Sequence, residues 1–367
     1  MRAAVAVFGT VVTETWFEQA CGLPSQEHRQ RAIARQRQLT KPEGALGRLE
    51  TLAIELAALQ GTDTPQAQRV PVLVFAADHG VTGQGVSAYP AEVTVQMLHN
   101  FAAGGAAIAV LARELGLPLH VWDVGSRATM SITGVVSDKT RHGTDDFSTG
   151  PAMSVADLDA AFAAGRRAVE AACVDGAELL VFGEMGIGNT TAASALAAVL
   201  GPLPLDELVG AGTGLDAVRM VQKKNIIARA LALHGDAINA ADVPGCEALL
   251  RVGGLEIAAI TAAMIAAAQR KVPVLVDGFI VSAAALAAVR VNPGVRPWLL
   301  FSHQSAERGH VRLLETLQAQ PLLSLDLRLG EGSGAALALP LVRMACALHN
   351  QMATFAEASV ADRGGLQ

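Results

Sequence analysis

One carboxylate, Glu331, stands among glycines in the stretch 329–335, which reads Leu-Gly-Glu-Gly-Ser-Gly-Ala. An apolar run precedes this stretch and a helix-like run follows it, so the pattern places Glu331 in a turn between a strand and a helix. Backbone N–H groups of such a turn can approach an anionic ligand, but a carboxylate repels an anion. Glu331 is better suited to accept a proton or to steady a positive charge, and we take it as the candidate general base.

A second glycine-rich turn, at 183–191, is the best candidate for binding a phosphate group. Its three glycines allow the backbone to approach a ligand closely. Thr190 and Thr191 can donate hydroxyl hydrogen bonds and cap the next helix, whose N-terminus favours an anion. The turn has neither the Gly-Lys-Ser/Thr of a Walker A loop nor a strict G-x-G-x-x-G. From the residues alone, phosphate binding and simple close packing both stay open.

Further side chains have types suited to a ligand site. Lys223 could neutralise a phosphate or be solvated on the surface of its helix. Glu184 lies inside the glycine-rich turn, where a phosphate would repel it, so we expect it to point elsewhere. Tyr89, the only tyrosine of the chain, could line an aromatic ligand pocket or close a loop. Ser87 and Gln96 complete this polar set.

The histidines and carboxylates do not have the spacing of a metal site. The dipeptide Asp78-His79 is a metal or acid–base pair at first sight, with His303 and His310 as partners. No H-x-x-x-H or H-E-x-x-H spacing is present, so we expect no metal and no other cofactor. No G-x-S-x-G elbow marks a nucleophilic serine. Aspartates at the ends of predicted strands are expected to cap helices and fix loops instead: Asp78, Asp123 and Asp277.

The composition sets the broad class of protein. The chain has 367 residues, of which 51% are hydrophobic, so it can bury a large core as one domain or two. Its net charge of −6 argues against a nucleic-acid binder. Four scattered cysteines predict free thiols in a cytoplasmic protein, and no apolar run reaches the roughly 20 residues of a membrane span. The start, 1–12, is only faintly like a signal peptide and is expected to stay in the mature protein.

Apolar strand, polar turn and helix alternate six times along the chain. This alternation predicts a mainly parallel six-stranded sheet with right-handed crossovers and flanking helices, an α/β fold. In such sheets ligands bind at the carboxyl ends of the strands, where the polar clusters described above fall. The expected strands are residues 70–77, 119–124, 178–182, 272–276, 298–301 and 322–327.

Helical segments at both chain ends lie outside this alternation. Residues 27–59 have a helical pattern that breaks at Pro42 and restarts near Leu46. We predict that residues 1–65 and 336–367 form a small helical domain and residues 66–335 a large α/β catalytic domain. Within the large domain, the polar segment 127–151 is predicted to be a loop excursion, and a Gly/Thr turn at 210–216 precedes the helix of Lys223.

From the residues alone, the chain is predicted to be a transferase or hydrolase that acts on a phosphorylated small molecule. As a set, its motifs resemble the nicotinate-nucleotide–dimethylbenzimidazole phosphoribosyltransferase family of cobalamin nucleotide-loop assembly. They span nearly the whole chain in the family's order, although residues 1–23 carry none and Ala45 stands where the family usually has Ser. The matching stretches are 39–50, 76–98, 104–112, 183–193, 212–216 with Lys223, 250–259, 272–285, 302–310, 327–337 and 352–360.

The resemblance implies a reaction and an architecture. Nicotinate mononucleotide and 5,6-dimethylbenzimidazole would give nicotinate and α-ribazole 5′-phosphate, with inversion at the ribose C1′ and with Glu331 as the general base. The glycines around Glu331 would then leave room for a flat ring to approach. The family is dimeric and needs no metal. It has a Rossmann-like large domain and a small helical domain built from both chain ends.

The same resemblance assigns roles to individual residues. Glu184 would assist near the ribose or the rings, beside the catalytic base Glu331. The expected phosphate-binding residues are Gly186, Gly188, Asn189, Thr190, Lys223, Ser302 and Ser305, and the base would lie against Ser87, Tyr89, Gln96 and Met185. Leu329 is expected to bind substrate as well.

Three other functions stay open from the sequence. A related phosphoribosyltransferase would use another acceptor, such as adenine or a phenol. A nucleotide-dependent oxidoreductase would need a strict dinucleotide fingerprint with an acidic residue about 20 positions on, which the chain lacks. A non-catalytic nucleotide sensor would tolerate replacement of Glu331 by Gln, because binding alone requires no proton acceptor.

Overall fold

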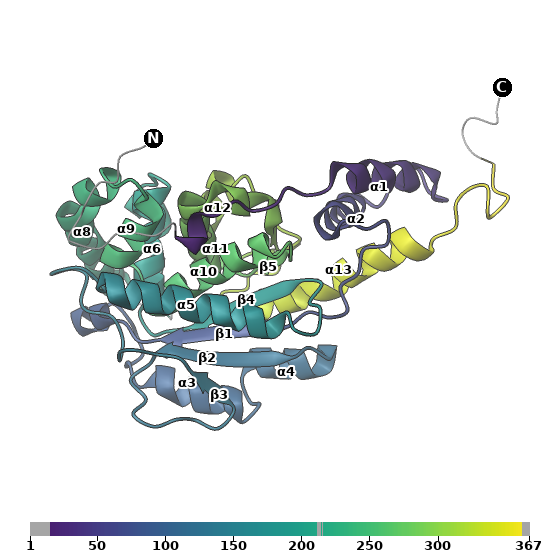
Figure 1. Cartoon of the computed structure of the whole chain (residues 1–367). Coiled ribbons are helices and arrows are strands. Elements are labelled where there is room, and N and C mark those ends of the chain that lie inside the picture. Colours follow the sequence, from purple (N-terminus) through teal and green to yellow (C-terminus); the bar gives the residue numbers. More distant parts are fainter. Residues whose placement is uncertain (1–14, 211–213, 215, 362–367) are drawn as a thin grey trace.

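The computed structural model describes residues 15–210, 214 and 216–361 of the chain. The N-terminal segment 1–12 lies outside these residues, as do positions 211–213 and 215 of the predicted Gly/Thr turn. Within the described part, one sheet runs through the middle of the molecule, and helices are placed around it and at its two ends (Figure 1).

The central sheet has six parallel strands in the order β3-β2-β1-β4-β5-β6, which confirms the predicted Rossmann-like α/β architecture. β1 and β4 occupy the middle, and every residue of β1 is buried, as expected for a strand covered on both faces. The strands are β1 (Val72–Ala77), β2 (Leu119–Gly125), β3 (Val135–Ser137), β4 (Leu180–Met185), β5 (Val274–Val276) and β6 (Leu299–Phe301).

Two of the predicted assignments along the sheet are wrong. The segment 322–327 contributes only β8 (Leu323–Ser324), which pairs with β7 (His303–Gln304) in a separate two-stranded sheet. The sixth strand of the central sheet is β3, inside the segment 127–151 that the sequence predicts to be a loop. Because β3 is a three-residue edge strand without a buried side chain, it has no apolar run that would reveal it.

Helices cover both faces of the sheet (Figure 1). α5 and α10 pack on one face, and α3, α4 and the N-terminal part of α13 lie on the other. α10 is buried along almost its whole length because it contacts the sheet, α5 and α11. These helices are α3 (Val93–Ala102), α4 (Ala107–Leu115), α5 (Val155–Ala172), α10 (Leu255–Gln269), α11 (Phe279–Val291) and α13 (Ser333–Gln351).

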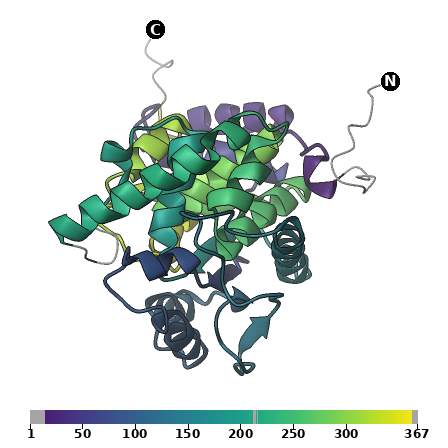
Figure 2. The same cartoon turned by 90° about the vertical axis from the view of Figure 1, so that its left-hand side faces the viewer.

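A second group of helices lies at the end of the molecule where β4 leads into α6. α8 and α9 pack against α6, and the long α8 crosses this end of the molecule in Figure 2. The helices of this group and of the neighbouring segments are α6 (Asn189–Leu200), α7 (Leu205–Leu208), α8 (Ala217–Asn239), α9 (Pro244–Val252) and α12 (His310–Thr316). Short 3-10 helices are η1 (Trp16–Glu18), η2 (Gly80–Gln84) and η3 (Pro293–Trp298).

Helices from near the two ends of the sequence, α1 (Gln26–Gln38), α2 (Arg48–Gln60) and α13, lie together at the right of Figure 1. α1 and α2 form the predicted broken helix, and α2 packs against α13. Arg35 donates hydrogen bonds to the backbone oxygens of His349 and Asn350 at 2.6 and 3.0 Å, which fastens α1 to the end of α13. α13 itself carries Pro340 in its interior. This grouping supports the proposed small helical domain, and the division of the chain at residues 65 and 336 stays a prediction.

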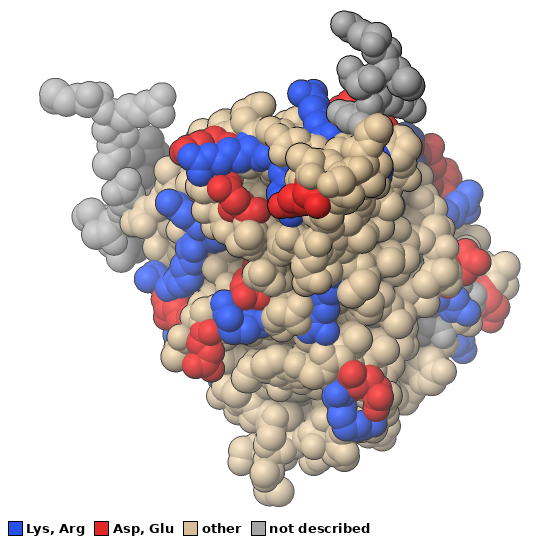
Figure 3. Space-filling view, turned by 90° about the vertical axis from the view of Figure 1, so that its right-hand side faces the viewer, with Lys and Arg blue, Asp and Glu red and all other residues tan. Residues whose placement is uncertain are grey.

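The surface around these helices carries charges of both signs. Figure 3, which views the molecule from the right-hand side of Figure 1, shows basic and acidic side chains next to one another. Ion pairs of α1 contribute to this mixture, since Arg31 contacts Glu27 and Asp63 and Arg37 contacts Glu43. The described part of this face therefore differs from the continuous basic surface of a nucleic-acid binder.

In the part of the chain that the structure describes, one apolar stretch, Val93–Leu115, has the length and composition to cross a membrane, with a mean hydropathy of 1.4. In the structure it is divided into α3 and α4, which are separated by a turn at Gly104. Length and composition alone are weak evidence for a span, because core helices pass the same test.

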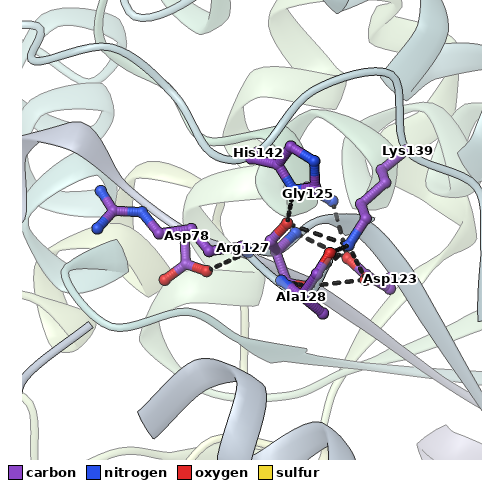
Figure 4. Close-up of polar contacts among 8 residues, drawn as sticks. Asp78, Asp123, Gly125, Arg127, Ala128, Lys139 and His142 are labelled. Atoms are coloured by element: carbon purple, nitrogen blue, oxygen red, sulfur yellow. Dashed lines mark hydrogen bonds and ion pairs between the residues drawn. The ribbon is translucent and has the colours of Figure 1, made fainter. Parts of the chain in front are cut away.

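A partly buried lysine holds the loop that follows β2 (Figure 4). The ammonium of Lys139 donates to Asp123 Oδ2 at 2.6 Å, to Ser126 Oγ at 3.1 Å and to two backbone oxygens. Asp123 also accepts hydrogen bonds from the backbone N–H and the hydroxyl of Ser126, both at 2.7 Å. Asp78 accepts one from the backbone N–H of Arg127 at 2.7 Å. These two aspartates therefore fix loops, as predicted.

The loop that carries Glu331 is pressed against the central strand β4. A Cβ atom on Gly183 would lie 2.1 Å from the backbone oxygen of Glu331 and 2.7 Å from the backbone nitrogen of Gly332. The two backbones can approach this closely only because Gly183 has no side chain. The sequence predicts Gly183 as part of the phosphate turn, but β4 runs on to Met185, so Gly183 is a packing residue of the strand.

Replacing Lys139 with Met is expected to lower the free energy of unfolding by about 3 kcal/mol, because the buried Asp123 carboxylate would lose its cation. The control is Arg167→Met, which removes an ion pair with Asp138 at the surface of the same region and should cost about 1 kcal/mol or less. Urea unfolding of both variants measures the difference. Equal losses would contradict the larger contribution of the buried pair.

The substitution Gly183→Ala is expected to destabilise the protein by about 1–3 kcal/mol, because the added Cβ overlaps the backbone of the Glu331 loop. The matched control is Gly235→Ala in α8, where the added Cβ meets no atom and the helix should gain roughly 0.5–1 kcal/mol. Thermal unfolding compares the two. A Gly183→Ala variant as stable as the parent would show that this loop can move away from β4 without cost.

Candidate functional site

A cavity of about 450 Å³ opens beyond the carboxyl ends of β4 and β5. Ligand sites of parallel α/β sheets lie at this edge. Both predicted catalytic carboxylates line the cavity, together with many of the predicted substrate-binding residues. The predicted site residues on its wall are Glu184, Glu331, Tyr89, Met185, Gly186, Asn189, Thr190, Ser305 and Leu329.

Three of the predicted phosphate-binding residues do not line the cavity. Lys223 lies behind Thr190, with its ammonium 2.8 Å from the Thr190 hydroxyl oxygen. Gly188 is the N-cap of α6 and has a φ of 98°, which favours glycine. Ser302 is buried, and its backbone N–H and hydroxyl both donate to the backbone oxygen of Val276.

The predicted base-pocket residues around Tyr89 lie toward solvent. Tyr89 is 55% exposed at the rim of the cavity. Ser87 is half-buried and accepts a hydrogen bond from the backbone N–H of Tyr89 at 3.2 Å. Gln96 is exposed on α3. The structure brings only Tyr89 of these three to the cavity wall, and the contacts of Ser87 and Gln96 with a base stay predictions.

Glu331 has an unusual backbone conformation. Its φ is 65°, in the left-handed region, between Gly330 at 89° and Gly332 at 87°. This conformation costs a non-glycine residue roughly 1–2 kcal/mol, so the surroundings must hold it in place. A Cβ atom on Gly330 would lie 2.1 Å from Glu184 Oε1. The glycines therefore serve the turn and its contacts with β4, whereas the sequence suggested room for a flat ring.

The Glu331 carboxylate is buried at the N-terminus of α4. The backbone N–H of Ile108 donates to Glu331 Oε2 at 3.2 Å, and the residue is 6% exposed. Burial raises the pKa of Glu331, and the negative charge of Asp277 adds to this increase. The N–H groups of Ile108 and Ala107 oppose it without cancelling it. The net upward shift makes Glu331 a stronger proton acceptor than an exposed glutamate.

Glu184, on β4, is the second buried carboxylate of the cavity. Burial raises the pKa of Glu184 to about 8, and the charges of Glu256 and Asp277 act in the same direction. A hydrogen bond from the Asn189 side-chain amide opposes the shift. At pH 7 Glu184 is therefore mostly protonated, and a neutral carboxylic acid can donate a hydrogen bond.

Asp277, which directly follows β5, binds the N-terminus of α13. Its two oxygens accept hydrogen bonds from the backbone N–H groups of Gly332 at 3.1 Å and Ala335 at 2.9 Å. Asp277 Oδ1 also lies 3.7 Å from His303 Nδ1, and both residues line the cavity. Burial raises the pKa of Asp277, and His303 acts in the opposite direction. Its predicted role in fixing loops is confirmed.

Lys223 is a buried cation beside the cavity. It is 1% exposed, so its alternative interpretation as a solvated surface lysine is wrong. Burial lowers the pKa of Lys223 to about 8, while the charge of Glu307 acts in the opposite direction. Glu307, Arg328 and Thr190 all line the cavity next to it. A buried ammonium group beside a cavity is suited to bind an anion.

The sequence did not identify several other residues of the wall. Asp277 directly follows β5, and Phe279 comes two residues later. Their place after a strand could have pointed to them, because ligands bind at the carboxyl ends of parallel strands. The charged residues Glu307 and Arg328 follow no strand of the central sheet, so the pattern carries no such signal for them. The remaining residues of the wall are Val93, Met97, Ile187, Gly278, Ile280, Val281, His303 and Gly330.

The buried histidines form hydrogen-bonded pairs. His79 Nε2 lies 2.7 Å from Glu256 Oε1, and neither side chain is exposed. His310 Nδ1 accepts a hydrogen bond from the backbone N–H of Ser305 at 2.7 Å, and its Nε2 lies 2.9 Å from Ser282 Oγ. Among residues 15–210, 214 and 216–361, no group of three His, Cys, Asp or Glu side chains has an arrangement that could hold a metal ion.

The chain matches the phosphoribosyltransferase family model over residues 21–360. The nicotinate-nucleotide–dimethylbenzimidazole phosphoribosyltransferase of a Bradyrhizobium species is 61% identical over 348 residues, which cover 95% of this chain and 98% of that protein. The protein of the same name from Pseudomonas putida is 55% identical over 353 residues, with 96% and 99% coverage.

Two solved structures share this fold. The nicotinate-nucleotide–dimethylbenzimidazole phosphoribosyltransferase of Thermus thermophilus is 44% identical, has a TM-score of 0.86, and covers 92% of this chain and 99% of its own. CobT from the same organism is 45% identical with a TM-score of 0.87, and the match covers 91% and 99% of the two chains. With its parallel sheet, its cavity of buried carboxylates and its full-length relatives, the chain belongs to the nicotinate-nucleotide–dimethylbenzimidazole phosphoribosyltransferase family.

Proposed function

We propose that the protein transfers the 5-phosphoribosyl group of nicotinate mononucleotide to 5,6-dimethylbenzimidazole, giving α-ribazole 5′-phosphate and nicotinate with inversion at C1′. The observation that carries this proposal is the buried Glu331 carboxylate, with its raised pKa, on the wall of the cavity. An acceptor that must lose an N–H proton needs such a group. The names of the relatives supply the class of substrates.

The acceptor ring loses one proton in this reaction. One ring nitrogen attacks C1′, the bond between C1′ and the pyridine nitrogen of the nucleotide breaks, and its electron pair stays on that nitrogen. The second ring nitrogen gives its proton to Glu331, which acts as general base. The departing pyridine ring is neutral, so no general acid is required. Backside attack converts the β-glycoside into the α-glycoside without a covalent enzyme intermediate, and positioning of the reactants supplies much of the acceleration.

Glu184 assists this chemistry as a neutral acid. Its raised pKa keeps it mostly protonated at pH 7, so it does not repel the phosphate-bearing substrate. The protonated carboxyl can donate a hydrogen bond to the ribose or to a ring. The close approach of Gly330 to Glu184 supports a shared site for the two glutamates.

The phosphate binds at the N-terminus of α6, next to Lys223. The first-turn N–H groups of a helix favour an anion. Because Lys223 donates to the Thr190 hydroxyl oxygen, the Thr190 proton is free to point to a phosphate oxygen. Ser305 has its backbone N–H and its hydroxyl engaged with His310 and Leu327, so we give it a smaller part in phosphate binding.

The apolar part of the wall receives the acceptor base. It is built of aromatic, aliphatic and methionine side chains, which match a dimethylated aromatic ring. Adenine would bring polar edge groups that need partners there, so this wall favours dimethylbenzimidazole. The side chains concerned are Tyr89, Val93, Met97, Met185, Phe279 and Leu329. Contacts of Ser87 and Gln96 with the base stay a prediction.

A homodimer in the cytoplasm completes the proposal. Large apolar side chains of the cavity wall are exposed, with Tyr89 at 55% and Leu329 at 61%. A partner subunit would remove this apolar surface from water. All four cysteines are unpaired, which suits a reducing compartment.

Incubation of the purified protein with nicotinate mononucleotide and a panel of bases tests the proposed function. Dimethylbenzimidazole is expected to release nicotinate and to yield the α anomer of the new glycoside. Release only with adenine or a phenol would identify a related transferase with another acceptor. If no base leads to release of nicotinate, the proposed transferase activity is wrong.

The substitution Glu331→Gln is expected to reduce turnover roughly 100-fold or more and to leave substrate binding nearly intact, because the amide cannot accept the proton. Steady-state kinetics with dimethylbenzimidazole and calorimetric binding of the nucleotide separate the two effects. Glu307→Gln is the matched control, since it neutralises another carboxylate of the same wall and should change turnover far less. Near-normal turnover of Glu331→Gln would exclude it as the base.

The affinity for the nucleotide is expected to fall as the pH rises through about 8. The pKa of Lys223 is about 8, so its ammonium is charged below this pH and neutral above it. The KM for nicotinate mononucleotide should therefore rise between pH 7 and pH 9, while the KM for dimethylbenzimidazole should not. In Lys223→Met this rise should become smaller, because only Glu184 then titrates near pH 8, and the nucleotide KM at pH 7 should increase about 10-fold. A nucleotide KM that is constant over this range would contradict the phosphate site.

A further inference from the structure

Asp277 is a buried carboxylate of the cavity wall that the proposed chemistry does not use. It is 1% exposed. Its Oδ2 accepts the hydrogen bond of the Gly332 backbone N–H, and its Oδ1 accepts that of Ala335. Because both oxygens are engaged with the backbone of the protein, Asp277 is poorly placed to take a proton from a substrate.

The first of these hydrogen bonds holds the residue next to Glu331. Three consecutive residues, Gly330, Glu331 and Gly332, have positive φ, so this turn is strained and depends on its anchors. Gly332 is also the N-cap of α13. By binding the N–H groups of Gly332 and Ala335, Asp277 fixes both the end of the turn and the start of the helix.

The same hydrogen bonds change the electrostatic surroundings of Glu331. Glu331 stands directly before the N-cap of α13, and its side chain reaches the N-terminus of α4. Each helix N-terminus carries partial positive charge and stabilises a carboxylate, which weakens that carboxylate as a base. Asp277 places a negative charge on the N-terminus of α13 and offsets this effect.

We propose that Asp277 is a positioning residue for the reaction, which holds the Glu331 turn through Gly332 and keeps the Glu331 carboxylate basic by neutralising the N-terminus of α13. This inference rests on the proposed role of Glu331 as general base. It adds a residue that touches neither the proton nor the reacting atoms.

Other ionisable groups surround the two carboxylates. His303 faces Asp277 from β7, and α4 contributes only backbone N–H groups to Glu331. Asp277 differs from the remaining groups in that it accepts hydrogen bonds from the first N–H groups of α13. The other charged and titratable groups of the cavity wall and of α10 are Tyr89, Glu184 of β4, Glu256 of α10, His303, Glu307 and Arg328.

The test is the dependence of kcat/KM on pH in the full-length protein, with nicotinate release as the assay. Glu331 must be deprotonated to act, so activity falls on the acid side of its pKa. This fall on the acid side is called the acid limb of the pH profile. Asp277→Asn removes a negative charge near Glu331, which lowers the pKa of Glu331 and moves the acid limb of kcat/KM to lower pH. The loosened turn also lowers kcat about 10-fold. Asp277→Glu keeps the charge, so its acid limb should stay near that of the parent protein.

The matched control is Ser333→Ala, which removes an uncharged anchor of the same turn, the hydrogen bond from Ser333 Oγ to the backbone oxygen of Gly330 at 2.6 Å. It should lower kcat without moving the acid limb. An acid limb that is unmoved in Asp277→Asn overturns the inference. If Asp277→Asn does not fold, as judged by circular dichroism, Asp277→Ser replaces it with the same two outcomes.

The Glu331→Gln variant separates this inference from the proposed function. The acid limb should be lost in Glu331→Gln, because the titrating base is absent. An acid limb that survives in that variant overturns the proposed base and the inference with it. If the acid limb is lost in Glu331→Gln but does not move in Asp277→Asn, the positioning role of Asp277 is wrong and the role of Glu331 as general base stands.

Discussion

Burial of several acidic side chains at one edge of the sheet is the constraint on which the rest of the site depends. A carboxylate withdrawn from water is costly unless hydrogen bonds or opposite charges compensate it. The protein provides a different partner for each buried acid, and these partners come from separate parts of the chain. The pairs are Glu184 with Asn189, Glu256 with His79, Asp277 with the start of α13, and Glu331 with the start of α4. Burial raises the pKa of Glu184, Asp277 and Glu331, and the hydrogen bonds from their partners oppose this rise.

The sheet supplies the rigid surface against which this arrangement is built. β4 lies in its middle, so the strand cannot shift to relieve pressure from the loop above it. Gly183 lets the Glu331 backbone rest directly on that strand. A strained turn persists when the surrounding structure leaves it no alternative, and here a central strand, a helix N-terminus and a buried aspartate act together.

The sequence was most informative where a local pattern decides the structure. Five of the strands are long or apolar enough to be recognised from their residues, and the turns that follow β4, β5 and β6 reach the cavity. β3 was not predicted from the sequence, because a short edge strand has no apolar run. Lys223 could not be placed, since the burial of one face of α8 depends on its packing against α6. His79 and Glu256 are 177 positions apart, and only the fold brings them together.

α13 connects the turn that holds Glu331 to α1 and α2. Its 19 residues span about 28 Å, from the N–H groups that bind Asp277 to the carbonyls that bind Arg35. Pro340 lacks the N–H that would bond one turn back, and its ring crowds the preceding carbonyl, so the helix bends most easily there. A displacement of α1 and α2 would therefore be taken up in part at Pro340. Movement of α1 and α2 would then reach the turn that holds Glu331 only in part.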